Sequence, residues 1–286
     1  MNCVSRVVEN YLLTRDISKE WSQQIEFRIG CFVEWLGNDP PFHSLDCNMA
    51  NRWLMELQQS SGLAPHTIHG YRTALHAVWK FAYEESFTEI PPLRLRKIKR
   101  PPLLVEAYTH EQLRMLRITA LNLPRNIEGT KIPRAVWWGA YIPAAYSTGL
   151  RRGCLLSLQH RHIDNDGVCV VYAKKTGKLT ARRLASYAID GIAEIATYIN
   201  SPLAFPRGSA DHAFGEDFKQ IVLRAGLPEH STSKWMRRSA ISYAEAELAG
   251  QGKELGGHSD ERVTNRSYRD MRIAPPPIVE PPAVEW

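Results

Sequence analysis

Six residues in the second half of the chain have side chains suited to chemistry on an anion. They are Arg151, Lys175, Lys234, Arg237, His258 and Tyr268. Arg151 follows a glycine at a predicted turn between two helices, and Lys175 lies at a predicted hairpin tip, from which its flexible ammonium can reach into a groove. Lys234 and Arg237 are three residues apart, on one face of the first turn of a predicted helix. Taken singly, each has an ordinary explanation as an ion pair, a turn residue, a cap or a packing aromatic.

The distribution of charge indicates a polyanionic partner. Of the 286 residues, 36 are Lys or Arg and 30 are Asp or Glu, a net charge of +6. Eight basic residues lie between Arg151 and Arg183, where the only acids are Asp164 and Asp166. A second basic cluster lies between two proline pairs and consists of Arg94, Arg96, Lys97, Lys99 and Arg100. A single charge run is usually solvated surface, but two dense ones favour a nucleic acid as the partner.

Composition excludes several classes of protein. Hydrophobic residues make up 44% and charged residues 23%, which is typical of a globular protein and not of a disordered or fibrous one. No apolar stretch approaches the roughly 20 residues that span a bilayer, and the first residues lack the apolar core of a secretory signal. The five cysteines show no paired spacing, which indicates reduced thiols. We therefore expect a cytoplasmic protein with no membrane partner, associated with the nucleoid when it binds DNA.

The sequence shows no motif for a metal or a nucleotide. Cys154, His160, His162 and Cys169 lack the Cys-x-x-Cys pairing of a zinc site. The segment 173–178 has one glycine and lacks the second that a phosphate-binding P-loop requires. We expect neither a metal nor another cofactor.

Residues 1–90 have helical periodicity throughout. The pattern predicts helices that start at Ser18 and end at Gly37, start at Asp46, and start at Pro65. On the last of these, a polar face separate from the apolar stripe contains His69, Arg72, His76 and Lys80. That face is either the solvated side of a core helix or a surface laid along a phosphate backbone, and spacing does not decide between them.

The remaining pattern predicts a second, mostly helical domain. Helices are expected over 111–118, 133–147, 190–199, 214–225, 234–249 and 259–270, and strands over 167–173 and 180–189. The predicted fold class is thus mostly α with one small antiparallel β-sheet. We expect a helical domain over 1–95, a basic linker bracketed by prolines over 96–108, a second domain over 109–272 and a proline-rich tail over 273–286.

Together and in order, the motifs resemble those of the tyrosine recombinases, the lambda-type phage integrases. The matching pieces are Thr148-Gly149-Leu150-Arg151, Lys175-Thr176-Gly177-Lys178, Trp235-Met236-Arg237-Arg238-Ser239-Ala240, and Leu255-Gly256-Gly257-His258-Ser259 leading to Tyr268. The first half resembles that family's helical, SAM-like core-binding domain, with Ala64-Pro65-His66-Thr67-Ile68 at the start of its last long helix. The resemblance covers residues 4–272, and although each motif is weak, the ordered set is specific.

The resemblance implies a role for each of these residues. Tyr268 would attack a DNA phosphodiester and form a covalent 3′-phosphotyrosine. Arg151 and Arg237 would clamp the five-coordinate phosphorus, because guanidinium groups match its oxygens and stay charged. Lys175 would protonate the leaving 5′-oxygen, His258 would bind the phosphate or orient the tyrosine, and Lys234 would donate to a phosphate oxygen.

The same resemblance implies how the chain engages DNA. It would form a clamp on DNA and act there as a homotetramer, as a monomer when free in solution, with accessory DNA-bending proteins as further partners. No metal or ATP is needed, because the phosphodiester energy is kept in the protein–DNA bond. The candidate DNA-binding residues are His69, Arg72, His76, Lys80, Arg96, Lys97, Lys99 and Lys178.

Three positions depart from the family pattern. Lys234 stands where the family usually has histidine, and Cys154 stands where an acid normally follows the first arginine by three residues. His258 and Tyr268 are ten apart, one more than the usual spacing, and one residue rotates a helical side chain by about 100°.

The main hypothesis is a site-specific recombinase of a mobile element. The alternatives are a type IB topoisomerase, which Lys234 favours, and a catalytically decayed, sequence-specific DNA-binding protein, which Cys154 and the Tyr268 spacing favour.

Overall fold

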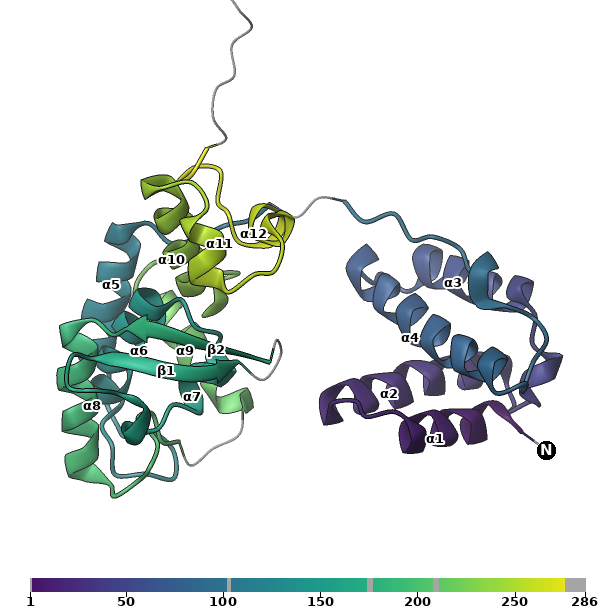
Figure 1. Cartoon of the computed structure of the whole chain (residues 1–286), viewed down its shortest axis with the longest axis horizontal. Helices are drawn as coiled ribbons and strands as arrows, with labels where there is room; N and C mark the ends of the chain where they lie inside the picture. The colour runs from purple at the N-terminus through teal and green to yellow at the C-terminus, as the bar shows by residue number, and fades with distance from the viewer. Residues whose placement is uncertain (1, 102–103, 174–176, 208–210, 276–286) are drawn as a thin grey trace, which may run out of the picture. The chain divides into compact units, whose positions relative to one another are not determined.

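The computed structural model describes residues 2–101, 104–173, 177–207 and 211–275. The chain divides into two compact units, Met1–Pro102 and Leu103–Trp286. Within the described residues there are twelve α-helices, short 3₁₀ turns and one two-stranded antiparallel sheet (Figure 1). The prediction of a mostly α fold with a small antiparallel sheet is confirmed.

The first unit is a bundle of four helices. They are α1 (Val4–Thr14), α2 (Lys19–Leu36), α3 (Cys47–Ser60) and α4 (Pro65–Glu84), with 3₁₀ turns η1 (Phe42–Ser44) and η2 (Pro92–Arg94). The predicted helix starts are confirmed, because the side chains of Ser18 and Asp46 accept hydrogen bonds from first-turn N–H groups and Pro65 opens α4. Gly37 ends α2 in the left-handed conformation, at φ 73°.

The core of this unit is built from the apolar stripes of the four helices. On α4 the predicted stripe is buried along its whole length, from Ile68 to Ala82. Phe32 of α2 packs on Trp53 of α3, with ring centroids 4.8 Å apart. Leu95 and Ile98 join the same core, so the first part of the predicted linker packs on this unit.

The second unit surrounds one buried helix. Its elements are α5 (His110–Leu121), α6 (Arg134–Thr148), α7 (Arg152–Leu156), η3 (His160–His162), β1 (Val168–Ala173), β2 (Lys178–Arg183), α8 (Ser186–Tyr198), α9 (Asp211–Arg224), α10 (Lys234–Glu247), α11 (Gln251–Gly256) and α12 (Glu261–Ser267). Helix α6 contacts α5, α8 and α10, and most of its residues are buried. At its contact with α8, a Cβ on Gly191 would lie 2.5 Å from the Cβ of Ala140, so only glycine fits there.

Aromatic packing holds α6 in place. The stacked rings of Trp137 and Tyr141 have centroids 4.8 Å apart, and both meet the ring of Phe205 edge-on. The buried guanidinium of Arg207 lies over Trp137 at 5.0 Å and pairs with Asp217 at 3.4 Å. This cation–π contact compensates for the absence of a hydrogen-bond partner at two of its nitrogens among the described residues.

Three predicted elements were wrong in extent. The strand expected over 180–189 ends at Arg183, and α8 begins at Ser186 instead of near 190. Its buried residues Ala188, Ile192 and Ile195 recur every three or four positions, which is helical periodicity. The helix expected over 259–270 spans only Glu261–Ser267, and α11 is an additional short helix before it.

Candidate active site

A cavity of about 360 Å³ in the second unit brings together four of the six residues singled out in the sequence. Arg151, Lys234, Arg237 and Tyr268 line it, together with Arg152. The rest of its described lining is apolar or neutral, and it contains no carboxylate. Four cations in one cavity, without an acid in its described lining to neutralise them, are suited to binding an anion.

The turn between α6 and α7 positions Arg151. Helix α6 ends at Gly149, whose φ of 58° is left-handed, and a Cβ there would lie 3.2 Å from the side chain of Leu255. Arg151 follows in an extended conformation as the N-cap of α7, and its carbonyl accepts a hydrogen bond from the N–H of Leu155 at 3.0 Å. The predicted turn is therefore present, and it places Arg151 at the cavity.

Arg237 is fixed by three hydrogen bonds. Lys234 opens α10, and Arg237 follows one turn later and is only 6% exposed. Its guanidinium donates to the carbonyls of Gly149 and of Gly256, the latter at 2.8 Å, and lies 3.3 Å from Nε2 of His258. Burial lowers the pKa of Arg237 below that of a free arginine, and the nearby charge of Arg151 lowers it further.

Tyr268 lies directly against these cations. Its ring centroid is 5.0 Å from the guanidinium carbon of Arg237 and 5.3 Å from Nζ of Lys234. Burial raises the pKa of the Tyr268 phenol, but the charges of Arg237, Lys234 and Arg151 and a hydrogen bond from Arg237 outweigh it. The pKa of Tyr268 is therefore lower than that of free tyrosine, which favours its nucleophilic form.

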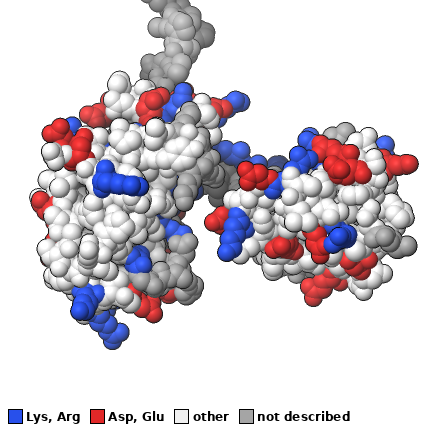
Figure 2. Space-filling model, turned by 60° about the horizontal axis from the view of Figure 1, so that its bottom comes forward, with Lys and Arg blue, Asp and Glu red and all other residues white. Residues whose placement is uncertain are grey.

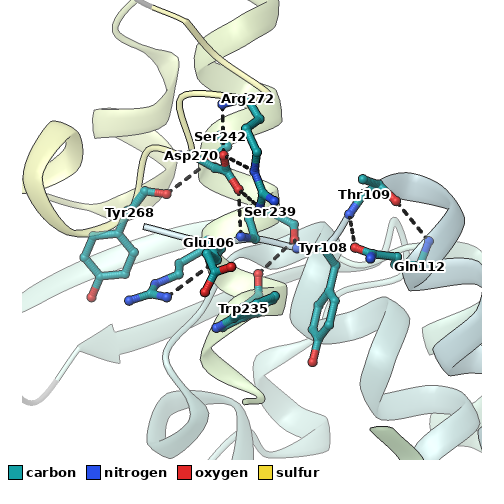
Figure 3. Close-up of polar contacts among 12 residues, drawn as sticks. Glu106, Tyr108, Thr109, Gln112, Trp235, Ser239, Ser242, Tyr268, Asp270 and Arg272 are labelled. Atoms are coloured by element: carbon teal, nitrogen blue, oxygen red, sulfur yellow. Dashed lines mark hydrogen bonds and ion pairs between the residues drawn. The ribbon is translucent and has the colours of Figure 1, made fainter. Parts of the chain in front are cut away.

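The main chain around Tyr268 is anchored to α10 (Figure 3). The hydroxyl of Ser242 donates to the carbonyl of Tyr268 at 3.0 Å and accepts from the N–H of Asp270 at 2.8 Å. The carboxylate of Asp270, only 1% exposed, accepts from the N–H of Ala107 at 2.9 Å and pairs with Arg272 at 2.6 Å. These contacts fix Tyr268 on the helix that carries Lys234 and Arg237.

The extra residue between His258 and Tyr268 is accommodated outside helical structure. Helix α12 ends at Ser267, and Tyr268 is its C-cap, with φ −133° and ψ −29°. The rotation expected for a helical insertion therefore does not apply, because the tyrosine lies past the end of the helix.

His258 is buried beside the tyrosine. The two rings are 4.6 Å apart between centroids, and Nδ1 of His258 lies 2.7 Å from Oγ1 of Thr264. Burial lowers the pKa of His258 to about 4, with smaller contributions from the charges of Arg237 and Arg151. The imidazole is neutral at neutral pH, and both of its nitrogens already have protein partners.

The remaining predicted site residues are less informative. Lys175 lies outside the described residues, and Lys178 begins β2 but its side chain is not among those described. Cys154 lies half-buried in α7 with a free thiol. Sequence reasoning missed Ser242, Thr264 and Asp270, whose residue types are ordinary and whose importance depends on contacts across the fold.

The predicted DNA-binding residues of the first unit occupy varied environments. Nε of Arg72 donates to the carbonyl of Arg96 at 2.7 Å, so this side chain holds the segment that follows η2. His69 and His76 are half-buried on α4, and burial lowers the pKa of His76. Lys80 is exposed and pairs with Glu84 at 3.6 Å. Exposed side chains also occur at the other three predicted positions, Arg96, Lys97 and Lys99.

Solved structures of site-specific recombinases match this fold over nearly the whole chain. A dimer of lambda integrase residues 75–356 bound to a COC′ core site matches with a TM-score of 0.75 and 14% identity, covering 94% of this chain and 96% of that one. A lambda integrase tetramer bound to a Holliday junction matches with a TM-score of 0.75 and 15% identity, covering 99% and 80%. The Tn1549 transposon integrase (residues 82–397) in complex with circular intermediate DNA matches with a TM-score of 0.66 and 17% identity, covering 93% and 95%.

This chain has the tyrosine recombinase fold. The resemblance noted in the sequence is thus confirmed for the fold, including both the core-binding and the catalytic part. No family model matches the sequence, and no curated protein matches it. At 14–17% identity this likeness is one of fold.

The described part of the chain shows neither a metal-binding cluster nor a membrane-spanning helix. Among the described residues no group of His, Cys, Asp or Glu side chains could hold a metal ion. No helix in the described part of the chain is long and apolar enough to cross a bilayer.

Proposed function

We propose that this protein cuts and rejoins DNA strands at specific sites through a covalent 3′-phosphotyrosine at Tyr268. The observation that carries the proposal is the placement of Tyr268 in a cavity with four cations and no carboxylate in its described lining, at ring distances of 5.0 and 5.3 Å from Arg237 and Lys234. The same cations would attract the phosphodiester and lower the pKa of the phenol, which favours the phenolate.

The chemistry follows from the side chains around the cavity. The Oη atom of Tyr268 attacks phosphorus, a new P–O bond forms, and the bond from phosphorus to the 5′-oxygen breaks. Negative charge grows on the non-bridging oxygens, where Arg151 and Arg237 stabilise it. The phenol, whose pKa is lowered, releases its proton to water, and the 5′-oxygen gains one, for which Lys175 is our candidate donor. Attack of the 5′-hydroxyl on the phosphotyrosine reverses the step, so neither metal nor ATP is consumed.

Three N–H groups of the Arg237 guanidinium already have partners within the protein. Of the five N–H groups of the guanidinium, three face Gly149, Gly256 and His258, the buried Nε–H has no partner among the described residues, and one Nη1–H is left for Tyr268 or a phosphate oxygen. The arginine is therefore held in place before DNA binds, which is what electrostatic stabilisation of a transition state requires.

The assembly and biological role are further parts of the proposal. We propose that residues 1–95 form the core-binding domain, that 96–108 link it to a catalytic domain over 109–272, and that the protein acts on double-stranded DNA as a tetramer for a mobile element. The matching structures include one lambda integrase tetramer on a Holliday junction and one transposon integrase on circular intermediate DNA, which supports this choice.

Capture of covalent adducts tests the proposal without knowledge of the target site. The protein is expressed in cells, the cells are lysed under denaturing conditions with a chelator, and DNA that remains attached to the protein is sequenced. Tyr268→Phe is the test variant, and Tyr198→Phe, which changes a partly exposed tyrosine of α8, is the matched control.

The outcomes separate the three candidate functions. Discrete sites captured with the wild type and Tyr198→Phe, but not with Tyr268→Phe, support a site-specific recombinase. Scattered sites with the same dependence on Tyr268 indicate a topoisomerase. Specific DNA binding under native conditions with no adduct from any variant contradicts the proposal and favours a protein that only binds DNA.

A further inference from the structure

A buried chain of contacts runs from Thr264 of α12 to the active-site arginine. Oγ1 of Thr264 lies 2.7 Å from Nδ1 of His258, and Nε2 of His258 lies 3.3 Å from Nη2 of Arg237. Thr264 is 0% exposed, and His258 and Arg237 are 7% and 6% exposed. Loss of one of these partners would therefore leave a buried polar group unpaired, which costs free energy.

The donors and acceptors in this series of contacts follow from the chemistry of the three side chains. A guanidinium offers only N–H donors, so Nε2 of His258 faces Arg237 as an acceptor and carries no proton. Because the imidazole is neutral, its single proton is on Nδ1, which donates to Oγ1 of Thr264. The alternative tautomer would place two donors, Nε2–H and Nη2–H, against each other.

This tautomer has a consequence for the arginine. With its lone pair on Nε2, His258 is one of three acceptors that hold the guanidinium of Arg237, together with the carbonyls of Gly149 and Gly256. His258 also packs against the ring of Tyr268, so a change in the imidazole would disturb both neighbours. Neither nitrogen of the imidazole is left to accept the phenolic proton of Tyr268.

We propose that Thr264 is a positioning residue for strand cleavage: its hydroxyl accepts the Nδ1 proton of His258 and holds the imidazole in the orientation in which Nε2 accepts from Arg237. The proposal rests on the function proposed above for its effect on rate. Its effect on the imidazole concerns the free protein and needs no DNA.

The first measurement is therefore spectroscopic. Long-range ¹H–¹⁵N spectra of the full chain, labelled at histidine, identify which imidazole nitrogen of His258 is protonated, and the His258→Asn variant assigns the signals. We expect a protonated Nδ1 and an unprotonated Nε2 in the wild type. Thr264→Val should shift the ring signals of His258, because its Nδ1–H loses the hydroxyl acceptor, and Thr264→Ser should keep the wild-type signals. A wild-type spectrum with the proton on Nε2, or unchanged His258 signals in Thr264→Val, overturns the proposal even if DNA cleavage is fully active.

The second measurement is the rate of cleavage. Single-turnover adduct formation on a nicked duplex of the captured sequence should fall by about tenfold in Thr264→Val, while affinity for the same duplex stays within about twofold. Thr264→Ser should restore the rate, and Thr197→Val, at an exposed threonine of α8, should leave it unchanged. A rate in Thr264→Val equal to that of the wild type would contradict the positioning role. Absence of adduct in the wild type would instead contradict the proposed function, and the spectra would still decide the tautomer.

Discussion

Two arginines, one in each unit, donate to main-chain carbonyls in very different settings. Arg72 of α4 holds the carbonyls of Arg96 and Leu95, at 2.7 and 3.4 Å, beside exposed basic residues. Arg237 of α10 holds the carbonyls of Gly149 and Gly256, but it is buried and lies next to another arginine, a lysine and a tyrosine. The same kind of hydrogen bond thus fixes a loop in one unit and, in the other, holds a guanidinium beside the tyrosine that we propose as the nucleophile.

The surroundings of the two arginines explain this difference. On the face drawn in Figure 2, the first unit carries acidic and basic side chains interspersed, so its basic residues are partly neutralised. The described lining of the cavity in the second unit holds four cations and no acid. Exposed charged side chains are screened by water and salt ions. Charges that stabilise a transition state have to be held in position before the reaction starts.

The largest effect is expected from Arg237→Lys. One ammonium cannot replace a guanidinium held by two carbonyls and an imidazole, so we expect adduct formation to fall by about 100-fold or more. The free energy of unfolding should also fall by about 1–3 kcal/mol, because buried acceptors lose their donor. Single-turnover cleavage and urea denaturation measure the two effects. Arg72→Lys is the matched variant, with an expected loss of cleavage below about threefold; equal losses in both variants would remove the distinction between the units.

The next effect concerns the pH dependence of cleavage. Because the pKa of Tyr268 is lower than that of free tyrosine, the cleavage rate should rise with pH and level off below pH 10. Lys234→Ala removes one of the charges that lower this pKa, so its profile should level off at higher pH, with a rate at pH 7 reduced by roughly tenfold. Lys219→Ala, which breaks an exposed pair with Glu229, is the control. Superimposable profiles for the wild type and Lys234→Ala would exclude this role of Lys234.

A smaller effect is expected for stability in acid. Burial raises the pKa of Asp270, but hydrogen bonds from Arg272 and Ala107 lower it by more, so its pKa is below the ordinary value in the folded state. The ionised carboxylate therefore stabilises the fold above pH of about 4, and this contribution is lost as the pH falls through the folded-state pKa. Asp270→Asn should lose about 1–3 kcal/mol at pH 7 and approach the wild type in acid.

Chemical denaturation at several pH values checks this prediction. Asp39→Asn in the first unit is the control, because Asp39 accepts a single exposed hydrogen bond from the N–H of Ser5. A constant difference between Asp270→Asn and the wild type across the pH range would contradict the assignment.

The smallest effect is expected from Lys80→Ala. Its exposed pair with Glu84 contributes at most about 0.5 kcal/mol, so stability should be unchanged. If the α4 face contacts a phosphate, DNA affinity should fall by about threefold and the slope of log affinity against log salt should decrease by about 0.9. An unchanged slope would identify the face as solvated surface.

Much of this architecture could be predicted from local sequence. The caps at Ser18 and Asp46, the proline that opens α4 and the glycine that ends α6 all depend on residues within a few positions of one another. The ordered motifs likewise singled out Arg151, Arg237 and Tyr268, and all three line one cavity.

Other features depend on contacts that local sequence does not contain. Ser242 meets Tyr268 and Asp270 across 26 and 28 residues, and Asp270 meets Ala107 across 163. Periodicity on α4 marked Arg72 as a candidate for DNA, but its partners are carbonyls 23 and 24 residues further along the chain. Local sequence also predicted a helix that continues to residue 270, whereas α12 ends at Ser267 and Tyr268 follows it as the C-cap.

The carbonyl contacts of Arg237 also affect how descendants of this chain would lose activity. Because this side chain joins the end of α6 to the end of α11, selection for a folded protein alone would retain it after catalysis had been lost. Tyr268 is held through its main chain by Ser242, so its hydroxyl can be lost with little cost to the fold. Among divergent copies, the tyrosine is therefore the better marker of a working enzyme, and the arginine is a marker of ancestry.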